Sequence, residues 1–445
     1  MRIVILGAAG RDFHDFLVLY KDDPSVEVVA ITATQIPYID DRRFPAALAG
    51  PRYPHGIPIV PEDELEALIA RHDVQQCVFA YSDVSNDYVA RMAARVNAAG
   101  ADLVMPGART MLPSQKPVIG VGAVRTGCGK SQTTRWILEH LAARGLRSVA
   151  IRHPMPYGDL VAQAVQRFAT HADLDHHRCT IEEREEYEPY LELGRVVYAG
   201  VDYAGILARA EQESDVILWD GGNNDLPLIR PDLHFVLLDA HRPGHARQWY
   251  PSEAQVRLAD VVIIAKADTA SPDAVQGERR LAAELAPGKP VIAIGSRLTL
   301  DGIDEAALRG RRVVVVEDGP TTTHGGMGYG AATLMAQRCG AEIIDPRPHL
   351  VGELAATFRK YSNLGPLVPA MGYSDQQRAD LAASLAATPA DLVLNGSPIQ
   401  LDRLVRLDKP IHRVRYDLEE LPGEPALAPI VDAFLRERGL LAQGG

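Results

Sequence analysis

The chain has 445 residues, 47% of them hydrophobic, and carries a formal net charge of −12 at pH 7. This length predicts two to four domains, and the acidic balance argues against nonspecific nucleic-acid binding, which needs a basic surface. Because no apolar run approaches the ~18–20 residues of a membrane helix and the four cysteines show no zinc-type spacing, we expect a cytoplasmic protein with free thiols, no membrane partner and no nucleic-acid partner.

Residues 1 to about 115 alternate between apolar strand patterns and helical segments. The expected strands are 2–6, 26–33, 76–80 and 102–105, and the expected helices are 13–20, 62–71 and 86–99. This alternation predicts a Rossmann-like domain with a parallel sheet covered on both faces. Arg11 and His14 follow the first strand at its carboxyl end, where open α/β sheets bind ligands. They are therefore candidates to bind an anionic substrate.

Gly7 and Gly10 form only part of the G-x-G-x-x-G fingerprint of dinucleotide-binding domains. The second strand also ends without the acidic residue that binds the ribose. A tight turn, in which the helix packs closely on the sheet, is favoured over an NAD site.

A glycine-rich turn after the strand pattern 118–124 delivers Lys130 and Ser131 to a helical segment at 132–144. This is the context of a phosphate-binding P-loop. Glycines let consecutive backbone N–H groups face one anion, at the positive end of a helix. Lys130 would reach the β- and γ-phosphates, and the Ser131 hydroxyl would hold Mg²⁺. The nucleotide-binding residues expected from this turn are Thr126, Gly127, Cys128, Gly129, Lys130, Ser131 and Gln132.

The sequence R-T-G-C-G-K-S is similar to the deviant Walker A motif of the SIMIBI class of P-loop NTPases. Val124 stands where the usual pattern has its first glycine. Many members of that class have a second basic residue at the position of Arg125. We expect Arg125 to neutralise charge that develops during phosphoryl transfer, in its own subunit or across a dimer.

A second strong pattern is the apolar run 216–219, which ends in Asp220 and two glycines. It fits a Walker B motif, whose aspartate holds Mg²⁺ beside the P-loop. Arg152 and His153 follow the strand 148–151 and are candidates to bind the transferred phosphoryl group or its acceptor, or else are incidental surface charges. The Glu-rich stretch 182–186 is expected to be mostly a solvated helix face, although a carboxylate such as Glu183 is a candidate to help hold Mg²⁺.

Further strand ends carry basic and polar residues. Arg242 follows the strand 234–238 and is a candidate for a phosphate-bearing substrate, or part of an exposed basic loop. Lys266 and Asp268 resemble the end of an N-K-x-D base-recognition motif, but Ala265 replaces its asparagine, so ATP is favoured over GTP. His324 lies in a threonine- and glycine-rich loop after the strand 312–316 and is another substrate candidate.

The expected organisation is a Rossmann-like domain at 1–115, a SIMIBI-type P-loop NTPase core at 116–330, and an α/β extension at 331–445 that either continues the core sheet or forms a separate lobe. The extension shows strand patterns at 342–344 and 391–394 and helical patterns at 349–361 and 375–386.

The chain resembles the cyclic 2,3-diphosphoglycerate synthetase family and its bacterial relatives through five motifs: VRTGCGKSQ, RHPMPYGDL, CTIEEREEYEP, WDGGNND and VEDGPTTTHGG. The resemblance extends to the N-terminal GAAGRDFHDF. It implies an enzyme that uses ATP and Mg²⁺ to act on a phosphorylated small acid, namely to close the two phosphates of 2,3-diphosphoglycerate into an anhydride, releasing ADP and phosphate. The similarity to the SIMIBI class also implies a homodimer. Two alternatives stay open: a SIMIBI-type GTPase or ATPase switch with a protein or metal client, and an NAD-linked oxidoreductase.

Overall fold

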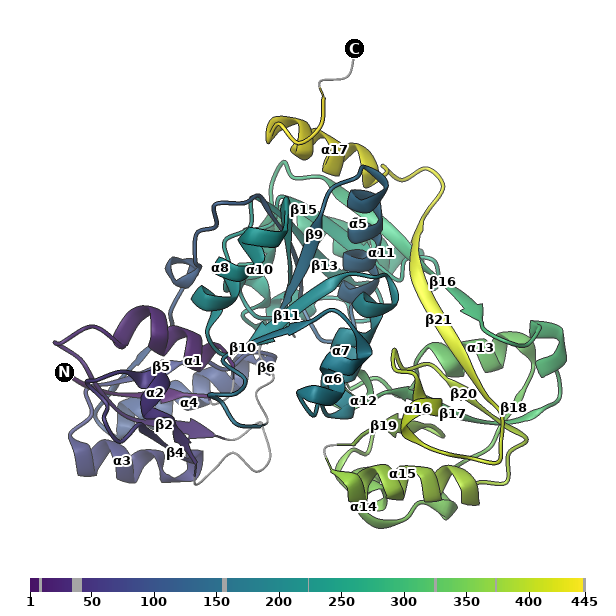
Figure 1. The fold of residues 1–445 in the computed structure, drawn as a ribbon, viewed down its shortest axis with the longest axis horizontal. Helices are drawn as coiled ribbons and strands as arrows, with labels where there is room; N and C mark the ends of the chain where they lie inside the picture. Colours follow the sequence, from purple (N-terminus) through teal and green to yellow (C-terminus); the bar gives the residue numbers. More distant parts are fainter. Residues whose placement is uncertain are drawn as a thin grey trace. The chain divides into compact units, whose positions relative to one another are not determined.

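A computed structural model describes residues 1–7, 10–33, 42–153, 158–222, 224–323, 326–372 and 374–442 (Figure 1). Contacts within the chain divide it into two compact units. Unit 1 comprises Met1–Arg167, Val196–Ala293 and Gly423–Gly445, and unit 2 comprises Phe168–Arg195 and Ile294–Pro422. Both are mixed α/β structures with mostly parallel strands, which is the fold class that the alternation of elements predicts.

The first sheet of unit 1 has the order β3-β4-β2-β1-β5-β7 and is parallel except for the pair β3–β4. Its strands are β1 (Arg2–Leu6), β2 (Glu27–Ala33), β3 (Arg43–Phe44), β4 (Ile57–Pro61), β5 (Gln76–Phe79) and β7 (Asp102–Val104). Its helices are α1 (Arg11–Asp15), which continues as a π-helical turn at Phe16–Tyr20, α2 (Ala46–Ala49), α3 (Leu65–His72) and α4 (Asn86–Ala98). The Rossmann-like assignment itself stays a prediction.

The second sheet of unit 1 carries the P-loop and includes the parallel order β11-β9-β12-β8-β13-β15-β16. Its strands are β8 (Val118–Ala123), β9 (Ser148–Arg152), β11 (Val196–Gly200), β12 (Val216–Asp220), β13 (Leu233–Asp239), β15 (Val261–Ala265) and the start of β16 (Val291–Leu300). Its helices are α5 (Lys130–Ala143), α8 (Tyr203–Glu213), α9 (His245–Gln248), α10 (Ser252–Arg257), α11 (Pro272–Leu285) and α17 (Ala428–Glu437). All residues of β8, β12 and β13 are buried, as expected for parallel strands covered on both faces.

A short antiparallel ribbon joins the two halves of unit 1. It pairs β6 (Val84–Ser85), which follows the first sheet's β5, with β14 (Trp249–Tyr250) from the second half. The loop before β6 is thereby held close to residues that follow β13. This matters for the P-loop, because that loop contributes a side chain to it.

Unit 2 is built on β17 (Arg312–Asp318), which pairs in parallel with β18 (Glu342–Ile343), β19 (Val368–Ala370) and β20 (Leu392–Asn395). β21 (Ile411–Glu420) pairs with β20 in parallel and with β16 antiparallel. The helices are α6 (His171–His176), α7 (Ile181–Glu192), α12 (Gly319–Thr322), α13 (Ala331–Cys339), α14 (Gly352–Lys360), α15 (Asp375–Ala387) and α16 (Leu401–Leu404). The strand β10 (Val165–Phe168) lies where the chain passes from unit 1 to unit 2.

One expectation about a helix surface is wrong. The Glu-rich stretch forms α7 as a helix, but Glu182, Glu183, Glu185 and Glu188 are all buried. Composition favoured a solvated face, whereas the tertiary structure buries most residues of this helix. None of the helices in the described parts of the chain combines the length and apolar character that a membrane crossing requires.

Candidate active site

The P-loop links the end of β8 to the start of α5. Gly127 and Gly129 have φ values of 76° and 97°, a region that glycine adopts without steric cost. Helix α5 begins at Lys130, two residues earlier than the sequence pattern suggests, so Lys130 and Ser131 are its first residues. Consecutive amides at the N-terminus of this 14-residue helix form a site for a phosphate group. Burial lowers the pKa of Lys130, while the charge of Asp220 acts in the opposite direction.

Asp220 is the last residue of β12, next to the P-loop strand. In the strand register it lies opposite Val121 of β8 and Arg152 of β9. The guanidinium of Arg152 donates to its carboxylate, with Nη1 and Oδ2 2.6 Å apart, and both side chains are buried. Arg152 therefore lies beside the Walker B aspartate, in the strand-end position that the sequence predicts.

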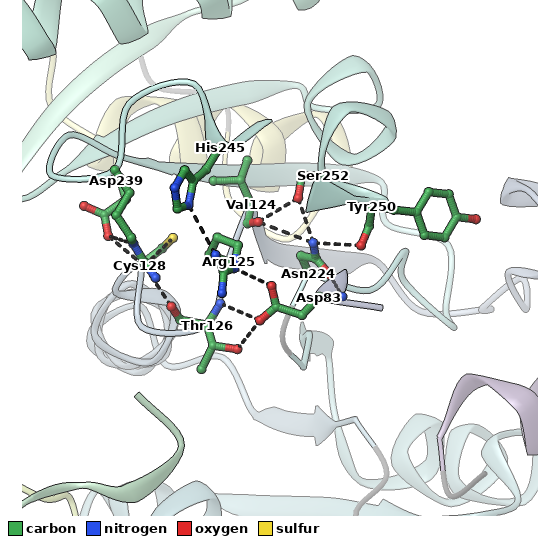
Figure 2. A network of polar contacts seen from close by, with 11 residues as sticks. Asp83, Val124, Arg125, Thr126, Cys128, Asn224, Asp239, His245, Tyr250 and Ser252 are labelled. Atoms are coloured by element: carbon green, nitrogen blue, oxygen red, sulfur yellow. Dashed lines mark hydrogen bonds and ion pairs between the residues drawn. The ribbon is translucent and has the colours of Figure 1, made fainter. Parts of the chain in front are cut away.

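Arg125 is fixed by a residue from the first sheet of unit 1. Its Nε lies 2.5 Å from Oδ1 of Asp83, which belongs to the loop before β6 (Figure 2). The other carboxylate oxygen accepts from the Thr126 hydroxyl at 2.8 Å. The Arg125 guanidinium also lies 3.4 Å above the ring of Trp249, a cation–π contact. Asp83 thus anchors two consecutive P-loop residues.

Sequence reasoning did not identify Asp83. Its signal was available, because it follows the strand 76–80 at its carboxyl end, as ligand-binding residues in parallel sheets do. Nothing in a single sequence indicated that this end would face the P-loop of another sheet.

Asn224 connects three segments around the P-loop (Figure 2). Its side-chain oxygen accepts from the Asp83 backbone N–H at 2.7 Å, and its amide donates to the Ser252 hydroxyl at 2.7 Å and the Tyr250 carbonyl at 3.1 Å. Ser252 in turn donates to the Val124 carbonyl at 2.6 Å. Asn224 is fully buried in this network and holds its segments together. Its neighbour Asn223 lies outside the described residues.

Arg242 and Lys266 share one carboxylate beside the P-loop. Nε of Arg242 lies 2.8 Å from Asp239 Oδ2, and Nζ of Lys266 lies 2.8 Å from the same oxygen. Arg242 also donates to the Thr126 carbonyl at 2.7 Å. Lys266, expected to pack on a nucleotide base, is held beside Asp239, and Asp268 is exposed in the turn after β15.

Two of the substrate candidates are occupied with other parts of unit 1. Arg11 donates to the Thr110 hydroxyl at 2.7 Å and to the Leu226 carbonyl at 3.1 Å. His14 contacts the Thr110 carbonyl at 2.7 Å, and burial lowers its pKa to about 4. His14 is therefore a neutral donor near pH 7, and both side chains bind protein groups.

His153 lies against the glycines that follow Asp220. Its Nδ1 is 3.1 Å from Oδ2 of Asp225, and a Cβ at Gly222 would come within 2.4 Å of its ring. A carboxylate beside an imidazole orients the ring. This pair is placed to bind a group near the Walker B turn.

Glu183 belongs to unit 2 and closes a capping box at the start of α7. It accepts from the Thr180 backbone at 2.8 Å, and the Thr180 hydroxyl accepts from the Glu183 backbone at 3.2 Å. His324 lies outside the described residues. Among the residues that are described, no cluster of three or more metal-binding side chains occurs.

Unit 1 therefore contains most of the residues expected to bind the nucleotide or take part in catalysis, together with two substrate candidates, Arg152 and Arg242. The first group comprises Arg125, Thr126, Gly127, Cys128, Gly129, Lys130, Ser131, Gln132, Asp220 and Lys266.

A curated protein named arginine synthetase ArcE, from Thermococcus kodakarensis, is 53% identical to this chain over 437 residues, covering 98% of this chain and 97% of that protein. The chain belongs to the arginine synthetase ArcE family. A protein named tetraacyldisaccharide 4'-kinase, from Anaeromyxobacter sp. (strain K), is 30% identical over 358 residues, covering 74% of this chain and 85% of that protein. A synthetase and a kinase, together with the P-loop, support an ATP-dependent enzyme.

No protein-family model matches the chain. The solved structure of hydrogenase maturation factor HypB from Archaeoglobus fulgidus matches with a TM-score of 0.27 and 13% identity, over 40% of this chain and 81% of that chain. Cobyrinic acid a,c-diamide synthase from Mycobacterium smegmatis matches with a TM-score of 0.19 and 16% identity, over 40% and 72% of the two chains. Scores this low carry no argument, so the P-loop assignment rests on the geometry of this chain.

Proposed function

We propose that this protein is an ATP-dependent synthetase that forms arginine. The observation that carries the proposal is the 53% identity to a protein of that name across nearly the whole of both chains. The P-loop supplies the second support, because it accounts for a nucleoside triphosphate as the energy source.

The chemistry of the product indicates the reaction. A guanidino carbon is made from a ureido carbon by replacing oxygen with nitrogen, and a ureido oxygen is a poor leaving group. Transfer of the γ-phosphoryl group of ATP to that oxygen makes it a good one, since phosphate then departs when ammonia attacks the carbon. Citrulline, ammonia and ATP thus give arginine, ADP and phosphate, and the leaving phosphate carries the former ureido oxygen.

The basic groups around the P-loop suit the transfer step. Lys130 and the amides of the α5 N-terminus would bind the β- and γ-phosphates. Arg125 and Arg242 are held against the loop by Asp83 and Asp239, so they need no reorganisation to stabilise charge on the phosphates. Such fixed donors are the main source of catalysis when the protein contributes no covalent chemistry.

Ser131 and Asp220 form a donor set that fits Mg²⁺, which binds proteins through few oxygen ligands and completes its shell with phosphate and water. When bound there, Mg²⁺ would neutralise charge on the phosphates. Arg152, at 2.6 Å from Asp220, would hold that carboxylate in place. The His153–Asp225 pair beside the Walker B turn is placed to accept a proton from ammonium, which must lose one to become a nucleophile.

The test is arginine formation by purified protein with ATP, Mg²⁺, citrulline and ammonium, followed by chromatography and mass spectrometry. We expect arginine and ADP in equal amounts. Lys130→Ala should reduce the rate by several orders of magnitude without loss of fold, whereas Lys289→Ala, at a half-exposed lysine paired with Asp260, should not. A folded Lys130→Ala protein with normal turnover would refute the mechanism.

A second candidate is synthesis of cyclic 2,3-diphosphoglycerate, favoured by the five motifs quoted above. It shares the P-loop chemistry and differs in the acceptor, which is a phosphate oxygen of 2,3-diphosphoglycerate. The same assay with this acid in place of citrulline, read by phosphorus NMR, separates the two. A nucleotide switch predicts slow hydrolysis that neither small molecule stimulates.

A further inference from the structure

Helix α7 in unit 2 directs three buried carboxylates toward the carboxyl ends of parallel strands. Glu182, Glu185 and Glu188 are spaced three residues apart and so share one side of the helix. Each meets a backbone N–H in the segment that follows a different strand. Glu182 accepts from Gly372 after β19 at 3.0 Å, Glu185 from Gly319 after β17 at 3.5 Å, and Glu188 from Gln400 after β20 at 2.9 Å.

Those three segments lie at one edge of the unit 2 sheet. Because β17 pairs in parallel with both β19 and β20, their carboxyl ends meet there. Ligands of open α/β sheets bind outside this edge, where neighbouring connections diverge. The backbone at this edge also lies too close to other atoms for a side chain at two glycines. A Cβ at Gly319 would come within 2.3 Å of the Ala370 carbonyl, and a Cβ at Gly372 within 2.3 Å of Ile181.

Two of these carboxylates are only partly compensated among the described residues. Oε2 of Glu182 and Oε2 of Glu185 are buried, and neither has a hydrogen-bond partner there. The charges that act on Glu185 are those of Asp318, Glu182 and Glu188, which are all acidic. Burial raises the pKa of Glu182 to about 7 and that of Glu185 well above its usual range. Buried carboxylates in folded proteins are normally paired with a cation or fully hydrogen-bonded.

Neighbouring acids in unit 2 show what full compensation looks like. Glu188 lies 3.5 Å from Arg184 and accepts the Gln400 amide. Glu317 accepts three hydrogen bonds at the start of α13, two of them from Thr333 at 2.7 Å. Glu182 and Glu185 differ from these structural acids, because each points one oxygen at no donor of the described chain.

We propose that the Glu182–Glu185 side of α7, facing the turns at Gly319 and Gly372, binds a guanidinium group, with arginine as its ligand. A guanidinium presents paired N–H donors in one plane, which match carboxylate oxygens, and two acidic side chains suit it better than a single ammonium. The inference rests on the proposed function for the identity of the ligand. It also distinguishes the two candidate functions, since a buried acidic site repels a phosphorylated acid.

The test is calorimetric titration of the full-length protein with arginine, citrulline and 2,3-diphosphoglycerate. We expect arginine to bind, and Glu185→Gln and Glu182→Gln each to weaken that binding at least tenfold. The matched control is Glu188→Gln, a buried acid on the same helix whose oxygens already have partners, and its affinity for arginine should change less than twofold. Circular dichroism and thermal unfolding verify that each variant folds.

A second measurement needs no variant. Binding of a cation to protonated carboxyl groups releases protons, so the binding enthalpy of arginine at pH 7 should depend on the ionisation enthalpy of the buffer. Unchanged arginine affinity in both Gln variants together with zero proton release would overturn the proposal. Loss of Ca²⁺ or Mn²⁺ binding in those variants, with arginine binding unaffected, would identify a metal site and overturn it as well.

The outcomes separate this inference from the proposed function. Lys130→Ala should abolish ATP-dependent arginine formation and leave arginine binding intact. Glu185-dependent arginine binding by a protein that makes no arginine would support the site and refute the function. If both Gln variants make arginine with an unaltered KM for citrulline and bind arginine with unaltered affinity, the proposed function is supported and the proposed site is refuted.

Discussion

The ion pair between Asp83 and Arg125 gives the sharpest prediction about the P-loop. Both side chains are about 5% exposed, and their Nε and Oδ1 atoms are 2.5 Å apart. Removing one partner of a buried pair costs about 3–5 kcal/mol, because the other charge stays buried and uncompensated. In Asp83→Asn the amide oxygen can still accept a hydrogen bond from the Thr126 hydroxyl. We therefore expect the free energy of unfolding to fall by about 2–4 kcal/mol.

Urea unfolding followed by tryptophan fluorescence measures this loss in the free energy of unfolding of unit 1. All three tryptophans of the chain, Trp136, Trp219 and Trp249, belong to unit 1, so their fluorescence reports its unfolding. The double variant Asp83→Asn/Arg125→Met should be more stable than Asp83→Asn alone, because it removes the orphaned charge.

The single variant Asp83→Asn should also bind ATP more weakly, with a KM for ATP raised about tenfold. The reason is that the Asp83 carboxylate positions both Arg125 and Thr126. Asp63→Asn, at an exposed acid of the 3-10 helix Glu62–Glu64 that follows β4, is the control and should change neither quantity. The reasoning is refuted if the free energy of unfolding of Asp83→Asn lies within about 0.5 kcal/mol of that of the wild type and its KM for ATP is unchanged.

Three further predictions follow from the geometry. Gly129→Ala places a side chain at φ 97° and within 2.7 Å of Gln132, so the KM for ATP should rise at least tenfold in steady-state assays. Gly222→Ala would put a methyl group 2.4 Å from His153 and should lower kcat about tenfold while ATP binding persists. The pKa of Glu182 is raised to about 7 in the folded protein, so folding favours the protonated carboxyl group. Its contribution of up to ~3 kcal/mol to the free energy of unfolding is present below pH ~4.5 and is lost as pH rises through 7.

Each of these predictions has a matched comparison. Gly145→Ala carries similar backbone strain with open space around the new Cβ, and Gly107→Ala meets no atom within 4 Å, so both should retain normal kinetics. Glu182→Gln cannot lose a proton, and its thermal midpoint without arginine should fall less between pH 5 and 8 than that of the wild type. If calorimetry shows that the thermal midpoints of the wild type and Glu182→Gln fall equally with pH, the raised pKa is wrongly assigned to Glu182.

The sequence was sufficient to predict the P-loop and most of the strands. Buried parallel strands are continuous apolar runs, and a glycine-rich turn before Lys130 has few other uses. Helix ends were less certain: α5 begins at Lys130 and α14 at Gly352 rather than at the expected 132 and 349. Local patterns fix the centre of a helix better than its ends.

Contacts between distant segments could not be predicted in the same way. Asp83 reaches Arg125 across 42 positions of chain, because the loop before β6 approaches the P-loop of the other sheet of unit 1. Asp239 holds Lys266 because β13 and β15 are neighbours in one sheet. The charge pattern of α7 was misleading for a related reason. Glu-rich composition indicates a solvated helix only when no sheet edge covers it, and here Glu185 is covered by the turn at Gly319.

The central claim is that the γ-phosphoryl group is transferred to the ureido oxygen of citrulline. Citrulline labelled with ¹⁸O at that oxygen tests it directly, with mass spectrometry of the phosphate released during turnover with ATP and ammonium. The account predicts one ¹⁸O atom in each phosphate and none in arginine. Unlabelled phosphate, released at the same rate with and without citrulline, would mean that water is the acceptor and would contradict the account.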